Sequence, residues 1–127
     1  MGKQLTNIVI PVGVTHIGLS AFLNNHLTNV IIPDSITHIG GSAFAHNGIT
    51  NVSIFNNITY INSNVFVNNQ LTSITIPEGV TSIEGSAFVH NPITDVILPD
   101  SLTYIGIEAF QNHQYDKCNN TCQCCVH

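Results

Sequence analysis

The residues best suited to chemistry in this 127-residue chain are its four cysteines, which all lie within the last eleven residues, KCNNTCQCCVH. Thiolate and imidazole groups are ligands for zinc, although structural zinc sites normally use two separated ligand pairs. One zinc ion could be held by three of these cysteines and a histidine, namely Cys118, Cys122 and Cys124 with His127 or His113. Two disulfides are the alternative, but the first residues contain no apolar leader, which favours the cytoplasm, a reducing compartment.

Cys124 and Cys125 suggest a further chemistry, because paired cysteines near a carboxyl end are sites of prenylation. The last four residues fit the C-a-a-X pattern loosely, yet histidine is a poor final residue and no basic segment precedes them. Prenylation would make the chain a lipid-anchored adhesion protein. The interpretation that needs no modification is a disordered tail with reactive thiols.

Two of the seven histidines, His16 and His38, are 22 residues apart. On adjacent strands their side chains would lie about 5 Å apart, close enough to share a divalent metal or to repel each other when protonated. Neither has a carboxylate or a cysteine at the same spacing, so we expect solvent-exposed histidines.

An enzyme is not indicated by the remaining polar residues. The seven carboxylates are scattered over several positions of the sequence pattern, and no Ser-His-Asp or Cys-His arrangement emerges. We therefore expect a non-catalytic protein with no cofactor, apart from the zinc that the cysteines could hold.

Composition excludes two classes of partner. Charged residues make up 7% of the chain, there is no arginine, and Lys3 and Lys117 are the only basic residues. Nucleic-acid binding needs Lys and Arg to displace counterions from phosphates, and a polybasic membrane patch needs the same residues. The longest apolar run is a few residues, so the sequence predicts no transmembrane segment.

A 22-residue repeat makes up most of the chain and must position the groups that precede the cysteines. Phenylalanines recur at this interval without insertion, and five units begin at residues 5, 27, 49, 71 and 93. In each unit an alternating stretch such as 71–76 predicts a half-buried strand, and a second such stretch follows a turn. We predict a lead-in over 1–4, a β-rich repeat solenoid over 5–114 with short 3₁₀ or helical turns, and a Cys-rich tail over 115–127.

The unit LTSITIPEGVTSIEGSAFVHN (71–91) resembles the leucine-rich repeat of the BspA-like family, and the resemblance extends from residue 5 to about 113. It implies a curved right-handed superhelix with a parallel sheet on its concave face. It also implies a role in adhesion or protein recognition, commonly on microbial cell surfaces. One departure is that many family members have cysteine three residues after the phenylalanine, where this chain has asparagine in four units and His113 in the fifth.

Two columns of the repeat are expected to build the interior. The phenylalanines should form a stacked spine. The asparagines should be buried and bond backbone groups of their own and the next unit. The recurring phenylalanines and asparagines are Phe22, Phe44, Phe66, Phe88 and Phe110, and Asn25, Asn47, Asn69 and Asn91.

The outward positions of the first strand of each unit are our candidate surface for a protein partner, because they mix exposed aliphatic and small polar groups. They are Asn7, Val9, Asn29, Ile31, Asn51, Ser53, Ser73, Thr75, Asp95 and Ile97. Two complete threonine columns flank these strands and raise the alternative of an ice-binding hydroxyl array. That alternative is disfavoured because the adjacent outward column is not threonine.

The ends of the solenoid suggest self-association. Each end exposes a sheet edge and a section of the apolar core, with few charges to guard it. End-to-end stacking into a structural element is the rival function. A two-fold pairing of like ends is the simplest closed form, so we expect a homodimer.

Overall fold

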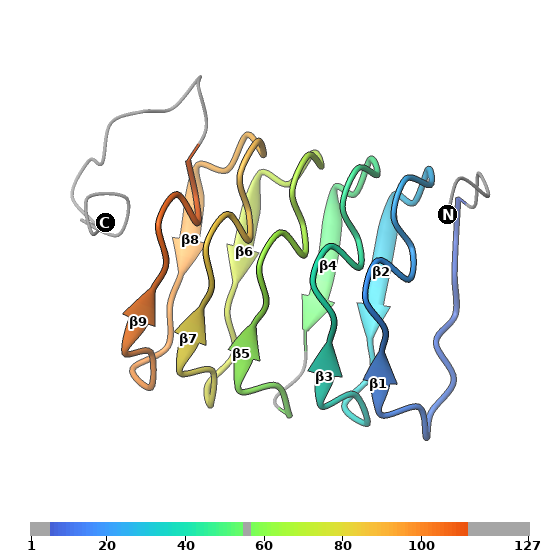
Figure 1. The fold of residues 1–127 in the computed structure, drawn as a ribbon, viewed down its shortest axis with the longest axis horizontal. Coiled ribbons are helices and arrows are strands. Elements are labelled where there is room, and N and C mark those ends of the chain that lie inside the picture. Colours follow the sequence, from blue (N-terminus) through green and yellow to red (C-terminus); the bar gives the residue numbers. More distant parts are fainter. Residues whose placement is uncertain (1–5, 55–56, 112–127) are drawn as a thin grey trace.

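The computed structural model describes residues 6–54 and 57–111, which form a parallel β-solenoid (Figure 1). Within these residues there are nine short strands and no helix. The long-strand file contains β2 (Asn29–Ile32), β4 (Asn51–Ile54), β6 (Ser73–Thr75) and β8 (Asp95–Ile97). The short-strand file contains β1 (His16–Ile17), β3 (His38–Ile39), β5 (Tyr60–Ile61), β7 (Ser82–Ile83) and β9 (Tyr104–Ile105).

Strands pair in register with the 22-residue repeat. Asn29 lies opposite Asn51 where β2 pairs with β4, and His16 lies opposite His38 where β1 pairs with β3. All strand pairs are parallel. Because the register equals the repeat, each sequence column becomes a row of neighbouring side chains, as the periodicity predicted.

The segment between the two files differs from the expected 3₁₀ or helical turn. Its amide groups bond alternately within the unit and to the next unit: Ala21 N–H donates to Gly18, whereas Phe22 N–H donates to the carbonyl of Ala43. Ser20 and Asn24 have φ of 55° and 63°, and this left-handed backbone interrupts any helical run. The expectation of helical turns was therefore wrong. The segment forms a third ladder of backbone hydrogen bonds, which joins neighbouring units of the chain.

The phenylalanine spine forms the centre of the core. Neighbouring rings are stacked with centroids 5.1–5.6 Å apart from Phe22 to Phe110. The three central rings, Phe44, Phe66 and Phe88, are fully buried, and the two terminal rings are partly buried. The predicted spine is confirmed.

Both strand files are interrupted in the third unit (49–70). β4 pairs with β2, and β5 pairs with β7, but neither β4 and β6 nor β3 and β5 pair among the described residues. Figure 1 shows the wider spacing at this seam. The spine continues across it, since Phe44 N–H donates to Val65 and the Phe44 and Phe66 rings stack 5.6 Å apart. In this unit the first strand is followed by Phe55, where the other four units have proline.

Candidate functional site

All ten predicted contact residues are exposed. Eight lie in strands of the long-strand file, and Asn7 and Val9 precede it, where Asn7 pairs with Asn29 at an isolated bridge. Two rows result from the register: one continues from Asn29 to Asn51, and the next from Ile31 to Ser53. On the other side of the seam the same rows pair Ser73 with Asp95, and Thr75 with Ile97. We call this surface the long-strand face.

Aliphatic groups on this face are strongly exposed. Val9 is 90% exposed, Ile31 64% and Ile97 63%, and all three belong to the same row. Asp95 is the one charged residue among the ten predicted contact residues. Large exposed aliphatic side chains on a weakly charged surface are typical of protein contacts rather than of sites for charged ligands.

Five threonines of the two columns donate their hydroxyl hydrogens to backbone carbonyls of the protein. Thr50 Oγ1 donates to Thr28 O at 3.2 Å, and Thr103 Oγ1 donates to Thr81 O at 3.0 Å. Further hydroxyls of both columns make the same bond to the preceding unit. These threonines therefore reinforce the strand files, which gives the columns a structural reason that does not involve ice.

The asparagine column forms a buried ladder. Asn47 Nδ2 donates to Phe44 O of its own unit and to Phe22 O of the preceding unit, at 3.1 and 3.0 Å. Its Oδ1 accepts from Leu27 N–H at 3.1 Å. Asn69 repeats these contacts one unit later. The predicted structural role is confirmed, with one correction. The second unit that Asn47, Asn69 and Asn91 bond is the preceding one, because each side-chain amide lies beside the phenylalanine carbonyl of that unit.

The two histidines of β1 and β3 form a stacked pair. Their ring centroids are 4.5 Å apart with planes 6° from parallel. Thr37 Oγ1 donates to Thr15 O and lies 3.0 Å from His38 Nδ1, so its oxygen is left to accept from an Nδ1–H. Parallel rings direct their free nitrogens side by side rather than at one point, which is a poor geometry for a shared metal ion.

No metal centre is found in the part of the chain that the structure describes. There, no three His, Cys, Asp or Glu side chains are grouped to hold an ion. The predicted zinc ligands Cys118, Cys122, Cys124 and His127, and the predicted lipidation sites Cys124 and Cys125, lie outside the described residues. No helix among the described residues is long and apolar enough to cross a membrane.

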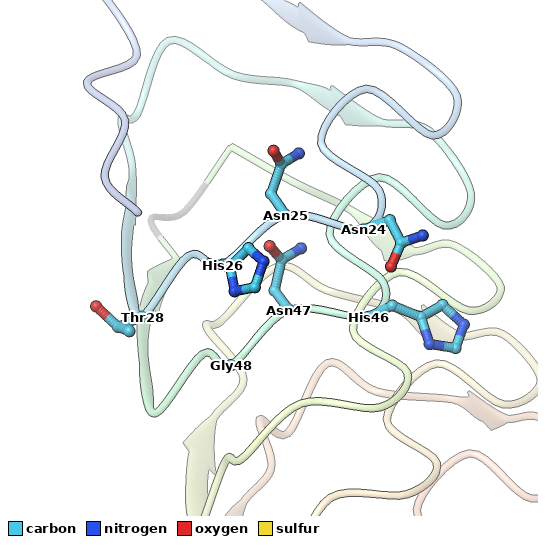
Figure 2. A pocket seen from close by; sticks show the side chains of 7 residues that line it. All are labelled: Asn24, Asn25, His26, Thr28, His46, Asn47 and Gly48. Atoms are coloured by element: carbon cyan, nitrogen blue, oxygen red, sulfur yellow. The ribbon is translucent and has the colours of Figure 1, made fainter. Parts of the chain in front are cut away.

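Sequence reasoning missed a polar hollow between the first two units (Figure 2). Its volume is about 610 Å³. The lining residues are Asn24, Asn25, His26, Thr28, His46, Asn47 and Gly48. A second hollow of about 470 Å³ shares Asn24 and His46 with it. The sequence feature that could have indicated this hollow is Gly48, which has no side chain where the neighbouring units carry His26 and Gln70.

Comparisons with known proteins agree with the geometry. The sequence model of the BspA type leucine rich repeat region matches residues 1–116 in six copies. A search of curated proteins finds no match. A solved leucine rich cell surface protein from Faecalibacterium prausnitzii is similar with 25% sequence identity and a TM-score of 0.61, over 70% of this chain. The chain spans 31% of the length of that protein.

Proposed function

The chain belongs to the BspA-type leucine-rich repeat family, and we propose that it is a non-catalytic module that binds a protein partner through its long-strand face. Repeat proteins of this type are usually surface or interaction modules. Solenoids suit this role because stacked units create an extended surface.

The row of exposed aliphatic groups is the observation that carries the proposal. Val9 and Ile31 lie on one side of the seam and Ile97 on the other, with Ser53 and Thr75 between them. Aliphatic anchors separated by small polar side chains can be desolvated at little cost, because few charges would lose their hydration. A sugar or a nucleotide would instead require a convergent set of hydrogen-bonding groups.

A paired substitution tests the proposal. Ile31→Asn combined with Ile97→Asn should abolish capture of the partner from a lysate of the native source, measured by crosslinking and mass spectrometry. Leu19→Asn is the matched control, since Leu19 is 78% exposed but lies outside the long-strand face. Loss of the same partner in the control, or its retention in the paired variant, would assign binding to another surface.

Self-association is the second candidate, supported by the incomplete cover of the end units. Core residues that are buried in central units are only partly buried at the ends, including Phe22 at one end and Phe110 at the other. We propose a homodimer through like ends, which would also leave the long-strand face accessible.

The chain could meet its protein partner in either of two compartments. The similar crystal structure is that of a cell surface protein, so the cell surface and the cytoplasm are the two locations to compare. Fractionation of the source cells, followed by detection of the chain, distinguishes the two locations.

A further inference from the structure

Asn47 and Gly48 form the one Asn-Gly pair in the sequence, and they lie at the polar hollow between the first two units (Figure 2). In such a pair the backbone nitrogen of the second residue can attack the side-chain carbonyl carbon of the asparagine. A glycine allows this approach most readily because it has no Cβ and its backbone is the least restricted.

In the folded chain both reacting groups are held by one residue. Leu27 N–H donates to Asn47 Oδ1 at 3.1 Å, and Leu27 O accepts from Gly48 N–H at 3.0 Å. Leu27 is fully buried. The nitrogen of Gly48 can therefore reach the side-chain carbonyl carbon of Asn47 only when Leu27, at the start of the second unit, moves away from these two residues at its end.

We propose that Asn47 is a site of spontaneous deamidation, that opening of the asparagine ladder governs its rate, and that its product releases the first unit of the solenoid. The Gly48 nitrogen loses its proton and bonds to Asn47 Cγ. The bond from Cγ to Nδ2 breaks, and ammonia leaves with the transferred proton. Water then opens the resulting succinimide to aspartate or isoaspartate.

The product is incompatible with the ladder. The Asn47 amide donates to the carbonyls of Phe22 and Phe44. A carboxylate is ionised at neutral pH and has no hydrogen to donate, so its oxygens would face two carbonyl oxygens. Phe22 O would keep Asn25 and Phe44 O would keep Asn69 as donors, but the hydrogen bond from Asn47 that joins the second unit to the first would be lost. Isoaspartate would in addition lengthen the backbone at this turn.

The other ladder positions provide internal controls. Asn69 is held by Ile49 as Asn47 is by Leu27: Ile49 N–H donates to Asn69 Oδ1 at 3.0 Å, and Gln70 N–H donates to Ile49 O at 2.9 Å. The same backbone bonds thus hold both asparagines, although Asn69 is buried and Asn47 half-buried. In denaturant this difference in burial is removed, and the following residue is what distinguishes the two sites. Asn91 precedes Pro92, whose nitrogen carries no hydrogen and cannot react in this way.

Deamidation rates test the proposal directly. The full chain is incubated at pH 8.5, with and without denaturant, and mapped by mass spectrometry that separates aspartate from isoaspartate. In denaturant Asn47 should react about tenfold or more faster than Asn69, and in the native chain its own rate should fall by about tenfold or more because opening is required. Equal native and denatured rates at Asn47, or a rate at Asn69 as high as that at Asn47, would overturn the proposal.

Gly48→Gln supplies a matched variant, because glutamine occupies the same position in the next unit. A Cβ at Gly48 would meet only Leu27 O at 3.7 Å, an ordinary contact, so the variant should fold. Asn47 should then react in denaturant as slowly as Asn69. An unchanged rate would show that Gly48 is not responsible.

Asn47→Asp stands in for the aspartate product. Its first unit should exchange backbone amides faster than that of the wild type, measured by hydrogen exchange at neutral pH. Asn24→Asp is the control for charge, because Asn24 lies at the same hollow but is exposed. Equal exchange in the two variants would contradict the release of the first unit.

Discussion

The side-chain amide of Asn69 lies 3.0 Å from the backbone carbonyl of Phe44, 25 residues earlier in the chain, and donates a hydrogen bond to it. The same nitrogen donates to Phe66 O at 3.0 Å. One side chain thus joins two units beside the phenylalanine spine. This contact crosses the third unit, where both strand files are interrupted, so the spine and the ladder hold the two halves of the solenoid together.

Asn69→Ala should lower the free energy of unfolding by about 3 kcal/mol. The substitution leaves Ile49 N–H without its acceptor, which costs about 1–3 kcal/mol. It also removes two hydrogen bonds, each worth about 0.5–1.5 kcal/mol, to the carbonyls of Phe44 and Phe66, which keep Asn47 and Asn91 as donors. Chemical denaturation measures the change. Gln70→Ala is the control, since Gln70 is exposed and should change the value by less than about 0.5 kcal/mol. Equal losses would show that the ladder does not stabilise the fold.

Phe66→Ala should bring the protein close to unfolding. Phe66 is fully buried and stacks on a ring at either side, and truncation of a buried phenylalanine costs about 3–5 kcal/mol. Phe110→Ala should cost less, because this terminal ring is partly buried and stacks on one neighbour. Denaturant melts of both variants test the order. A loss below about 1 kcal/mol at Phe66 would contradict a packed spine.

Ser42→Gly should stabilise the protein. Ser42 has φ of 60°, a left-handed conformation that costs a residue with a Cβ about 1 kcal/mol and costs glycine little. The gain should be a rise in the free energy of unfolding of about 0.5 kcal/mol, because glycine also adds entropy to the unfolded chain. Ser53→Gly in β4 is the control and should destabilise. A destabilised Ser42→Gly would mean that the serine side chain makes a needed contact.

The burial pattern of this fold was predictable, and its turns were not. Apolar residues at a fixed 22-residue interval can be buried together only if the units stack in register, so the columns that contain Phe66 and Asn69 were readable from the sequence. A left-handed backbone is usually signalled by glycine, but here Ser20, His46 and Glu108 adopt it. Their conformation is imposed by bonds between units, which no local pattern encodes.

The candidate site was predictable in part for the same reason. Alternation placed Ile31 and Ile97 on the outward face because side chains of a strand point to opposite sides. The seam and the polar hollow depend on the path of a turn and on the missing side chain at Gly48. Both are differences between units, and a consensus drawn from the repeat averages such differences away.

The amino-terminal edge should support a homodimer, and Val9→Pro should weaken it. Val9 belongs to the same column as Ile97, whose carbonyl accepts from Ile76 of the preceding unit. By analogy with Ile97, we expect the backbone N–H and carbonyl of Val9 to be directed away from β2 and to pair with a second copy. Proline removes the N–H from this edge while leaving the pairing with β2 unchanged.

Val9→Ala keeps the N–H and is the control for the side chain. Light scattering over a hundredfold range of concentration should show a dimer for the wild type and for Val9→Ala, and a shift toward monomer for Val9→Pro. A wild type that stays monomeric throughout would contradict the dimer. A dimer that persists in Val9→Pro would move the contact to the opposite end, where Phe110 closes the spine.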